Sequence, residues 1–183
     1  MTMAALLLLG DSITEAFPAQ ELLSGHTVVN AGVYGDNSRL LLQRLERDVR
    51  PKTADLLLLL IGTNDMACGY SSGETVRSIG ECVRRIRSYG GIRSVAVQSI
   101  LPTRGVANRP NLRIQFLNSQ LRRLAAAEGC RYWDIHSLFV NSLGDLAEEF
   151  SDDGLHLTRR GYDVWAAHIN DRLAADGETT DRP

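Results

Sequence analysis

Apolar runs separated by glycine and polar clusters recur along the chain. The strongest spans residues 55–61 and contains five consecutive leucines, and a second run spans residues 4–9. A run that is apolar on both faces is typical of a central strand in a parallel sheet covered by helices on both sides. Shorter runs at residues 27–31, 95–100 and 130–135 complete five predicted strands.

Between these runs, apolar residues recur at helical spacing. Leu40, Leu41, Leu45 and Val49 form one such stripe. Helices are predicted at residues 15–23, 39–49, 73–89, 112–128 and 158–174. Strands that alternate with helices predict an α/β fold, a three-layer α/β/α sandwich around a flavodoxin-like five-stranded parallel sheet. Residues 103–109 are polar and are expected to form a mobile loop, while residues 137–150 have no clear pattern.

Length and charge limit the class of protein. The 183 residues predict a single domain at residues 1–175, followed by a polar tail at residues 176–183 that we expect to be frayed. The net charge of −2 and the lack of a basic block argue against nucleic-acid or anionic-membrane partners. The run at residues 3–9 has no basic flank and is too short to span a bilayer, so we expect no signal peptide and a cytoplasmic protein. The oligomeric state is left open.

The three cysteines, Cys68, Cys82 and Cys130, are widely spaced along the chain. An odd number at this spacing matches neither a disulfide framework nor a zinc site. Because free cysteine is among the most buried residue types, we expect three buried, reduced thiols and a reducing compartment.

Candidate chemistry gathers where the predicted strands end. Ser12, Gly35 and Asn64 follow the first three strands, and Asp153 and His156 lie in the loop before the last helix. The carboxyl ends of parallel strands share one edge of the sheet, where ligands bind in open α/β folds. We therefore expect the first three residues to converge at that edge.

Together these residue types supply what acyl transfer needs: a nucleophile, a base, a group that orients the base, and donors for the oxyanion. Ser12 is the candidate nucleophile. His156 is the candidate base, because imidazole titrates near neutral pH, and Asp153 can orient it from three positions earlier. The backbone N–H groups of Ser12 and Gly35 and the side-chain amide of Asn64 are the candidate oxyanion donors.

Four short segments resemble the blocks of the SGNH hydrolases, also called GDSL esterases, and occur in the same order. They are Gly10-Asp11-Ser12-Ile13, Gly35-Asp36, Gly62-Thr63-Asn64-Asp65 and Asp153-Gly154-Leu155-His156. The resemblance implies a serine hydrolase of carboxylic esters that needs neither metal nor organic cofactor. It implies a triad of Ser12, Asp153 and His156, and an oxyanion hole made by Ser12, Gly35 and Asn64.

The chain departs from the family pattern at two positions. Ile13 replaces a leucine, which is conservative, and Tyr34 stands before Gly35 where a small residue is common. The second change predicts an altered rim of the acyl pocket. Met66, Tyr70, Ile100 and Pro102 also lie just past strand ends, where they either line that pocket or pack the loops; the sequence leaves both open.

Several polar residues near these segments have simpler interpretations. Ser12 or Asn64 alone would be an ordinary turn or cap residue, and Gly35 a residue of positive φ. Asp11 is expected to orient the turn through backbone hydrogen bonds, and Asp152 to cap its own turn. The other three histidines are expected to be structural or exposed; they are His26, His136 and His168. Of these, His136 follows the fifth strand and lies near the same edge of the sheet.

The short chain leaves little room for a large lid or a long acyl tunnel. We therefore expect a small-molecule ester as substrate, with a short acyl group such as the acetyl ester of a sugar or small alcohol. Two alternatives remain. One is a lysophospholipase or thioesterase with a longer acyl group, and the other is a non-catalytic carbohydrate- or nucleotide-binding module on the same fold.

Overall fold

Five parallel strands form a sheet in the computed structural model, which describes residues 3–180 and the side chains of residues 3–175. The strands are Ala5–Gly10 (β1), Thr27–Gly32 (β2), Leu56–Leu60 (β3), Val95–Gln98 (β4) and Arg131–Trp133 (β5). Their order across the sheet is β2-β1-β3-β4-β5, and all four neighbouring pairs are parallel. This is the order of flavodoxin-like folds, so the predicted fold class is confirmed.

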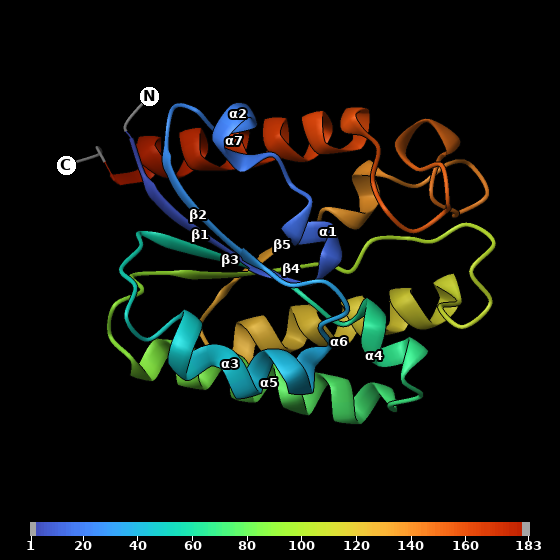
Figure 1. Cartoon of the computed structure of the whole chain (residues 1–183), viewed down its shortest axis with the longest axis horizontal. Coiled ribbons are helices and arrows are strands. Elements are labelled where there is room, and N and C mark those ends of the chain that lie inside the picture. The colour runs from blue at the N-terminus through green and yellow to red at the C-terminus, as the bar shows by residue number, and fades with distance from the viewer. Residues whose placement is uncertain (1–2, 181–183) are drawn as a thin grey trace.

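Helices cover both faces of the sheet (Figure 1). Those on one face are α3 (Ser38–Asp48), α5 (Ser72–Ser88) and α6 (Asn111–Ala127); those on the other are α2 (Ala19–Leu22) and α7 (Arg159–Thr180). Alternate leucines of β3 enter different cores: Leu57 and Leu59 pack with the first group, and Leu56, Leu58 and Leu60 with the second. Each buried leucine contributes about 1.5–3 kcal/mol. The leucine run therefore holds both helix layers to the sheet.

The structure corrects the predicted helix at residues 15–23. In place of one helix the chain forms two short helices, α1 (Ser12–Glu15) and α2, and Pro18 lies between them. Proline lacks a backbone N–H and disfavours helical geometry in the residue before it, so a continuous helix cannot pass this point.

Other boundaries differ where the apolar pattern is weak. A short helix that the pattern does not predict, α4 (Thr63–Ala67), begins three residues after the end of β3. Residues 136–150 include the 3₁₀ turns His136–Leu138 and Glu148–Phe150. Helix α7 extends to Thr180 rather than ending at residue 174, so it includes part of the segment assigned to a polar tail. Residues 181–183 of that tail lie outside the described residues.

Two predictions about burial are wrong in part. Leu40 is 44% exposed, whereas Leu41, Leu45 and Val49 of the same stripe are buried. Among the free thiols, Cys82 is buried, but Cys130 is only half-buried and Cys68, at the end of α4, is exposed. Burial raises the pKa of Cys82 to about 12, so this thiol stays protonated.

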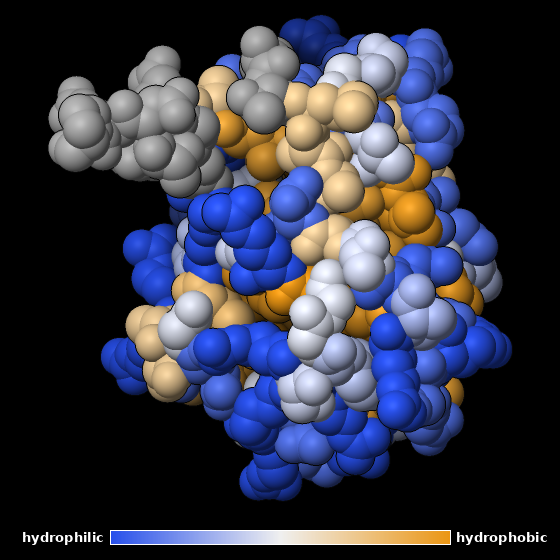
Figure 2. All heavy atoms as spheres, turned by 90° about the vertical axis from the view of Figure 1, so that its left-hand side faces the viewer, coloured by the Kyte–Doolittle hydropathy of each residue, from blue (hydrophilic) through white to orange (hydrophobic). Residues whose placement is uncertain are grey.

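The two ends of the sheet differ in what they carry. Figure 2 shows the face at the amino ends of the strands, where hydrophilic residues cover most of the lower half and apolar residues gather above them. The opposite end carries the loops that follow β1, β2 and β3, and hence the candidate site. Within residues 3–180, no helix combines the length and apolar character needed to cross a membrane.

Candidate active site

Ser12 lies at the first position of α1, just beyond the carboxyl end of β1. A Cβ atom on Gly10 would lie 2.3 Å from the Leu60 carbonyl oxygen, so only glycine lets the ends of β1 and β3 come this close. Asp11 caps the helix, because its Oδ1 accepts a hydrogen bond from the Ile13 N–H at 3.0 Å. The turn-orienting interpretation of Asp11 is thus confirmed, and the serine projects from a fixed turn.

Ser12, His156 and Asp153 form a continuous hydrogen-bond chain. Ser12 Oγ lies 3.1 Å from His156 Nε2, and His156 Nδ1 lies 2.7 Å from Asp153 Oδ2. Partial burial alone would raise the pKa of Asp153. Hydrogen bonds from the His156 ring and from the N–H groups of His156 and Leu155 outweigh it and hold that pKa well below its usual range. The carboxylate therefore stays ionised and orients the imidazole.

The loop that carries Asp153 and His156 is tied to the loop at residues 103–110. Gly154 has a φ of +76°, and a Cβ atom there would lie 1.9 Å from the Arg104 carbonyl oxygen. The Arg104 N–H donates to the Gly154 carbonyl at 2.9 Å, and Arg104 Nη2 donates to the Ser151 carbonyl at 2.6 Å. Residues 103–109, expected to be a mobile loop, thus carry hydrogen bonds that support the triad.

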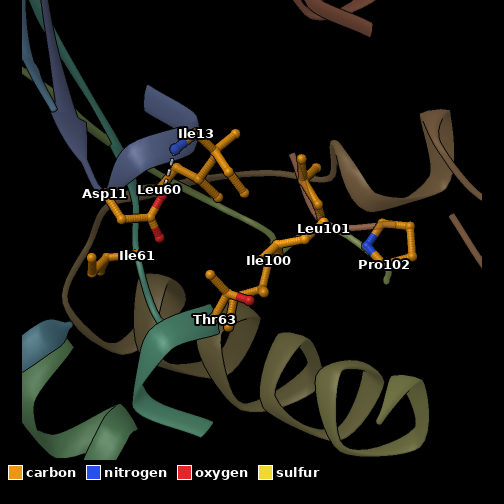
Figure 3. Close-up of a pocket in the computed structure, with 9 residues that line it drawn as sticks. Asp11, Ile13, Leu60, Ile61, Thr63, Ile100, Leu101 and Pro102 are labelled. Carbon is orange, nitrogen blue, oxygen red and sulfur yellow. Dashed lines mark hydrogen bonds between the residues drawn. The ribbon is translucent and has the colours of Figure 1, made fainter. Parts of the chain in front are cut away.

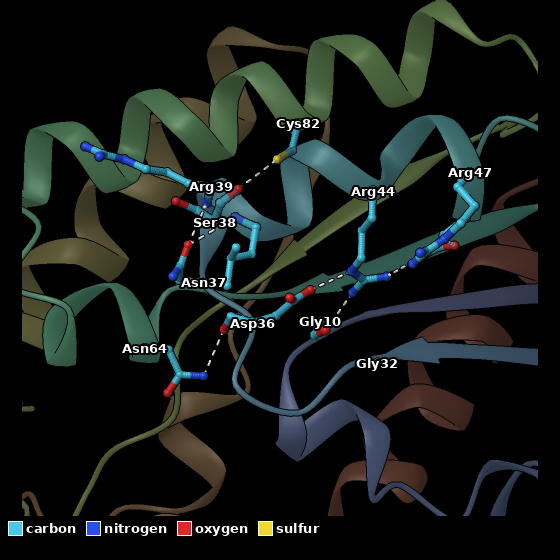
Figure 4. A network of polar contacts seen from close by, with 12 residues as sticks. Gly10, Gly32, Asp36, Asn37, Ser38, Arg39, Arg44, Arg47, Asn64 and Cys82 are labelled. Carbon is cyan, nitrogen blue, oxygen red and sulfur yellow. Dashed lines mark hydrogen bonds and ion pairs between the residues drawn. The ribbon is translucent and has the colours of Figure 1, made fainter.

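Gly35 and Asn64 lie in the segments that follow β2 and β3. Asn64 Nδ2 donates to the carbonyl oxygen of Asp36 at 2.8 Å, which joins the two segments (Figure 4). Neither the Ser12 N–H nor the Gly35 N–H has a hydrogen-bond acceptor among the described residues. The structure thus links the three predicted triad residues by hydrogen bonds, and it links the segments of Gly35 and Asn64 through the Asp36 carbonyl.

A buried arginine on α3 joins the loop that follows β2 to the end of β1. Arg44 Nε lies 2.5 Å from Asp36 Oδ2, and its Nη2 donates to the Gly10 carbonyl oxygen at 3.0 Å (Figure 4). Burial raises the pKa of Asp36, and the Arg44 hydrogen bond opposes that rise. Sequence reasoning missed Arg44, although its place beside Leu45 in the buried stripe of α3 was an available signal.

Asp65 has a similar supporting role. It is fully buried in α4, and its Oδ2 accepts from the Ser38 N–H at 2.9 Å, while its Oδ1 accepts from the Ser38 hydroxyl. Burial raises the pKa of Asp65 in spite of these bonds. The contact fixes α4, and with it Asn64, against the start of α3.

Two of the predicted substrate contacts line a cavity next to Asp11 and Ile13, the neighbours of Ser12 in the chain. Ile100 and Pro102, with Asp11, Thr63 and others, enclose about 10 Å³ (Figure 3). That is room for about one water molecule and not for an acyl chain. Of the remaining candidates, Met66 is buried in the core, Tyr34 is 76% exposed, and the Tyr70 ring lies 4.0 Å from the Arg39 guanidinium carbon.

The other histidines lie outside the triad. His26 pairs with the Ala4 N–H and the Asn170 side chain, and the His168 ring meets Trp133 edge to face. His136 is half-buried, and burial lowers its pKa. Across residues 3–175, no group of three or more His, Cys, Asp or Glu side chains is placed to hold a metal ion.

Comparisons with known proteins show the family to which the chain belongs. The model of the GDSL-like Lipase/Acylhydrolase family matches residues 8–164. The N-acylneuraminate cytidylyltransferase of Escherichia coli is 23% identical over 159 residues, which cover 86% of this chain but 37% of that protein. Platelet-activating factor acetylhydrolase IB subunit alpha1 of Pongo abelii is 28% identical over 163 residues, covering 84% of this chain and 68% of that protein.

Solved structures agree as well. A protein from Streptococcus pneumonia, described as a candidate platelet activating factor, superposes with a TM-score of 0.86 at 30% identity, covering 94% of this chain and 85% of the other. The resemblance in the four sequence blocks is thus matched over most of the chain. The chain belongs to the GDSL-like lipase/acylhydrolase family and is an ester hydrolase of this type.

Proposed function

We propose that the protein is a serine esterase that hydrolyses esters of short acyl groups through an acyl-enzyme. The observation that carries this proposal is the chain of hydrogen bonds from Ser12 Oγ through His156 to Asp153. Ser12 Oγ attacks the ester carbonyl, and its proton passes to His156 Nε2 while Asp153 stabilises the imidazolium. His156 then protonates the leaving alcohol and activates the water that releases the acyl group.

Three donors would stabilise the tetrahedral oxyanion. They are the N–H groups of Ser12 and Gly35, which have no acceptor among the residues described, and the Nδ2 of Asn64. Preorganised donors of this kind are strong contributors to catalysis, since removing one costs about 10²–10³-fold in kcat. Their placement at the ends of three neighbouring strands supports an acyl-transfer mechanism.

The surroundings of Ser12 support a short acyl group. The cavity beside Asp11 and Ile13 holds only about 10 Å³, and the triad is open to solvent, with the side chains of His156 40% and Asp153 55% exposed. One of the relatives is named an acetylhydrolase. We therefore favour acetyl esters of a sugar or small alcohol.

One observation favours a longer acyl group instead. An open groove of about 440 Å³ runs along residues 103–112 and includes Val106, Pro110 and Leu112. Such a groove offers apolar surface on which the chain of a lysophospholipase or thioesterase substrate could lie. It is shallow, and Arg109 and Asp145 place charged groups in its lining, so we rank this function second.

The mechanism is tested by hydrolysis of p-nitrophenyl acetate, with EDTA present, by the wild type and by Ser12→Ala. We expect kcat to fall by at least about 10³-fold in the variant, as for loss of a triad nucleophile elsewhere. Ser119→Ala, an exposed serine on α6, is the matched control and should keep full activity. Full activity in Ser12→Ala would contradict the proposal. A folded wild type that neither turns over nor reacts with a fluorophosphonate would indicate a binding module.

Acyl preference is tested by kcat/KM across p-nitrophenyl esters from acetate to palmitate. Because the cavity beside Asp11 and Ile13 holds only about 10 Å³, we expect the highest value at acetate or butyrate and a steady decline beyond hexanoate. An optimum between C8 and C16 would favour the longer-chain alternative. In that case Leu112→Asp, in the open groove, should lower activity on the long esters and leave acetate unchanged.

A further inference from the structure

The carboxamide of Asn64 is held at both ends. Its Nδ2 donates to the Asp36 carbonyl oxygen at 2.8 Å, and its Oδ1 accepts from Arg109 Nη2 at 2.8 Å. A backbone carbonyl can only accept, and a guanidinium can only donate. These two partners therefore fix which end of the amide is nitrogen, and they leave its second N–H free to donate elsewhere.

Arg109 is itself held in place by its loop. Thr103 Oγ1 donates to the Arg109 carbonyl oxygen at 2.7 Å, and the Arg109 N–H donates to the Val106 carbonyl at 3.0 Å. Asn111 closes the base of the loop through two hydrogen bonds with the Thr103 backbone, each 2.8 Å long. The same loop binds the Gly154 carbonyl through the Arg104 N–H, so it contacts both the acid–base loop and the oxyanion side of the site.

The charge of Arg109 also reaches the centre of the site. It is close enough to Asp11, next to the nucleophile, to oppose the rise that burial causes in the pKa of that carboxyl group. A cationic donor on the amide oxygen polarises the carboxamide, and polarised groups in a hydrogen-bond chain donate more strongly. The Asn64 N–H groups thus become better donors for a developing negative charge.

We propose that Arg109 is a positioning residue of the oxyanion hole, which locks and polarises the Asn64 carboxamide so that its free N–H points at the oxyanion. The inference rests on the proposed serine-esterase function. Arg109 is 45 positions from Asn64 along the chain and lies outside the four family blocks. It acts through Asn64 and does not touch the reacting atoms.

The proposal predicts a specific kinetic pattern. Arg109→Met keeps most of the aliphatic stem but removes the guanidinium. We expect it to lower kcat for p-nitrophenyl acetate by about 10- to 100-fold, somewhat less than loss of a whole oxyanion donor, with KM changed less than about threefold. Arg109→Lys, which keeps a charged donor, should recover part of the loss and still reports on the site if Arg109→Met does not fold.

A double-variant cycle with Asn64→Ala separates action through Asn64 from any other role. If Arg109 works by holding Asn64, Arg109→Met should cost less than about threefold in kcat once Asn64 is alanine, because neighbours that act together are not additive. Arg122→Met, on the exposed surface of α6, is the matched arginine control and should leave kcat unchanged in both backgrounds.

Three outcomes would overturn the proposal: an unchanged kcat in Arg109→Met, an equal fold loss in both backgrounds, or a loss confined to KM. Each is read against a wild type whose activity depends on Ser12. Failure of the proposed function, in which Ser12→Ala keeps full activity, is therefore distinguished from failure of this inference.

Discussion

Arg44 shows how much of this site depends on residues that hold its loops in place and take no part in the proposed reaction. Its side chain is only 8% exposed, and it contacts Asp36, Asp48 and the Gly10 carbonyl. In Arg44→Met the buried carboxylate of Asp36 loses its partner, and leaving such a charge unpaired costs about 3–5 kcal/mol. We expect a loss of that size in the free energy of unfolding by urea.

Arg47 is the matched control for this prediction, since it lies on the same helix and its side chain is 75% exposed. Its ion pair with Asp48 lies at the surface, where solvent screens the attraction and such pairs contribute little to stability. Arg44→Met and Arg47→Met should therefore differ by several kcal/mol. Equal losses in the two variants would show that the Arg44–Asp36 pair does not support the fold.

At the level of elements, the sequence predicts best where the pattern is strongest. The leucines of β3 predict a central strand because they are apolar on both faces, and the structure buries all five. Pro18 by itself indicates a break in the helix, whereas the apolar spacing of residues 15–23 predicts a continuous one. Helix α4 has no apolar stripe of its own; it forms where the chain leaves β3, and the buried Asp65 holds it against α3.

The residues of the candidate site also differ in how well the sequence predicts them. Ser12, Asn64, Asp153 and His156 are predictable because their residue types and positions after strands carry the chemistry. Arg109 is not, because its partner Asn64 lies 45 positions away and is reached only through the folded loop. The candidate acyl contacts are harder to predict, because a residue just past a strand end can fill the core, as Met66 does, or line a cavity, as Ile100 and Pro102 do.

For the whole molecule, the burial of Asp11 beside the nucleophile makes the free energy of unfolding depend on pH. Asp11 is almost completely buried, and this burial raises the pKa of its carboxyl group to about 7, in spite of the Ile13 hydrogen bond and the charges of His156 and Arg109. An aspartate in an unfolded chain titrates near pH 4. Between these values the folded protein holds a proton that the unfolded chain has lost.

Stability linked to Asp11 is therefore complete below pH 4 and is lost as the pH rises towards 7, by about 1.4 kcal/mol per pH unit at most. Asp11→Asn removes this titration and keeps the oxygen that caps Ile13. Contributions of other groups, such as Asp153, occur in both proteins and cancel in the difference. Urea unfolding at pH 4, 5.5, 7 and 8 should show the variant gaining stability relative to the wild type up to about pH 7 and no further. A difference that stays constant across this range would mean that Asp11 is ionised in the folded protein, with its charge balanced by its neighbours.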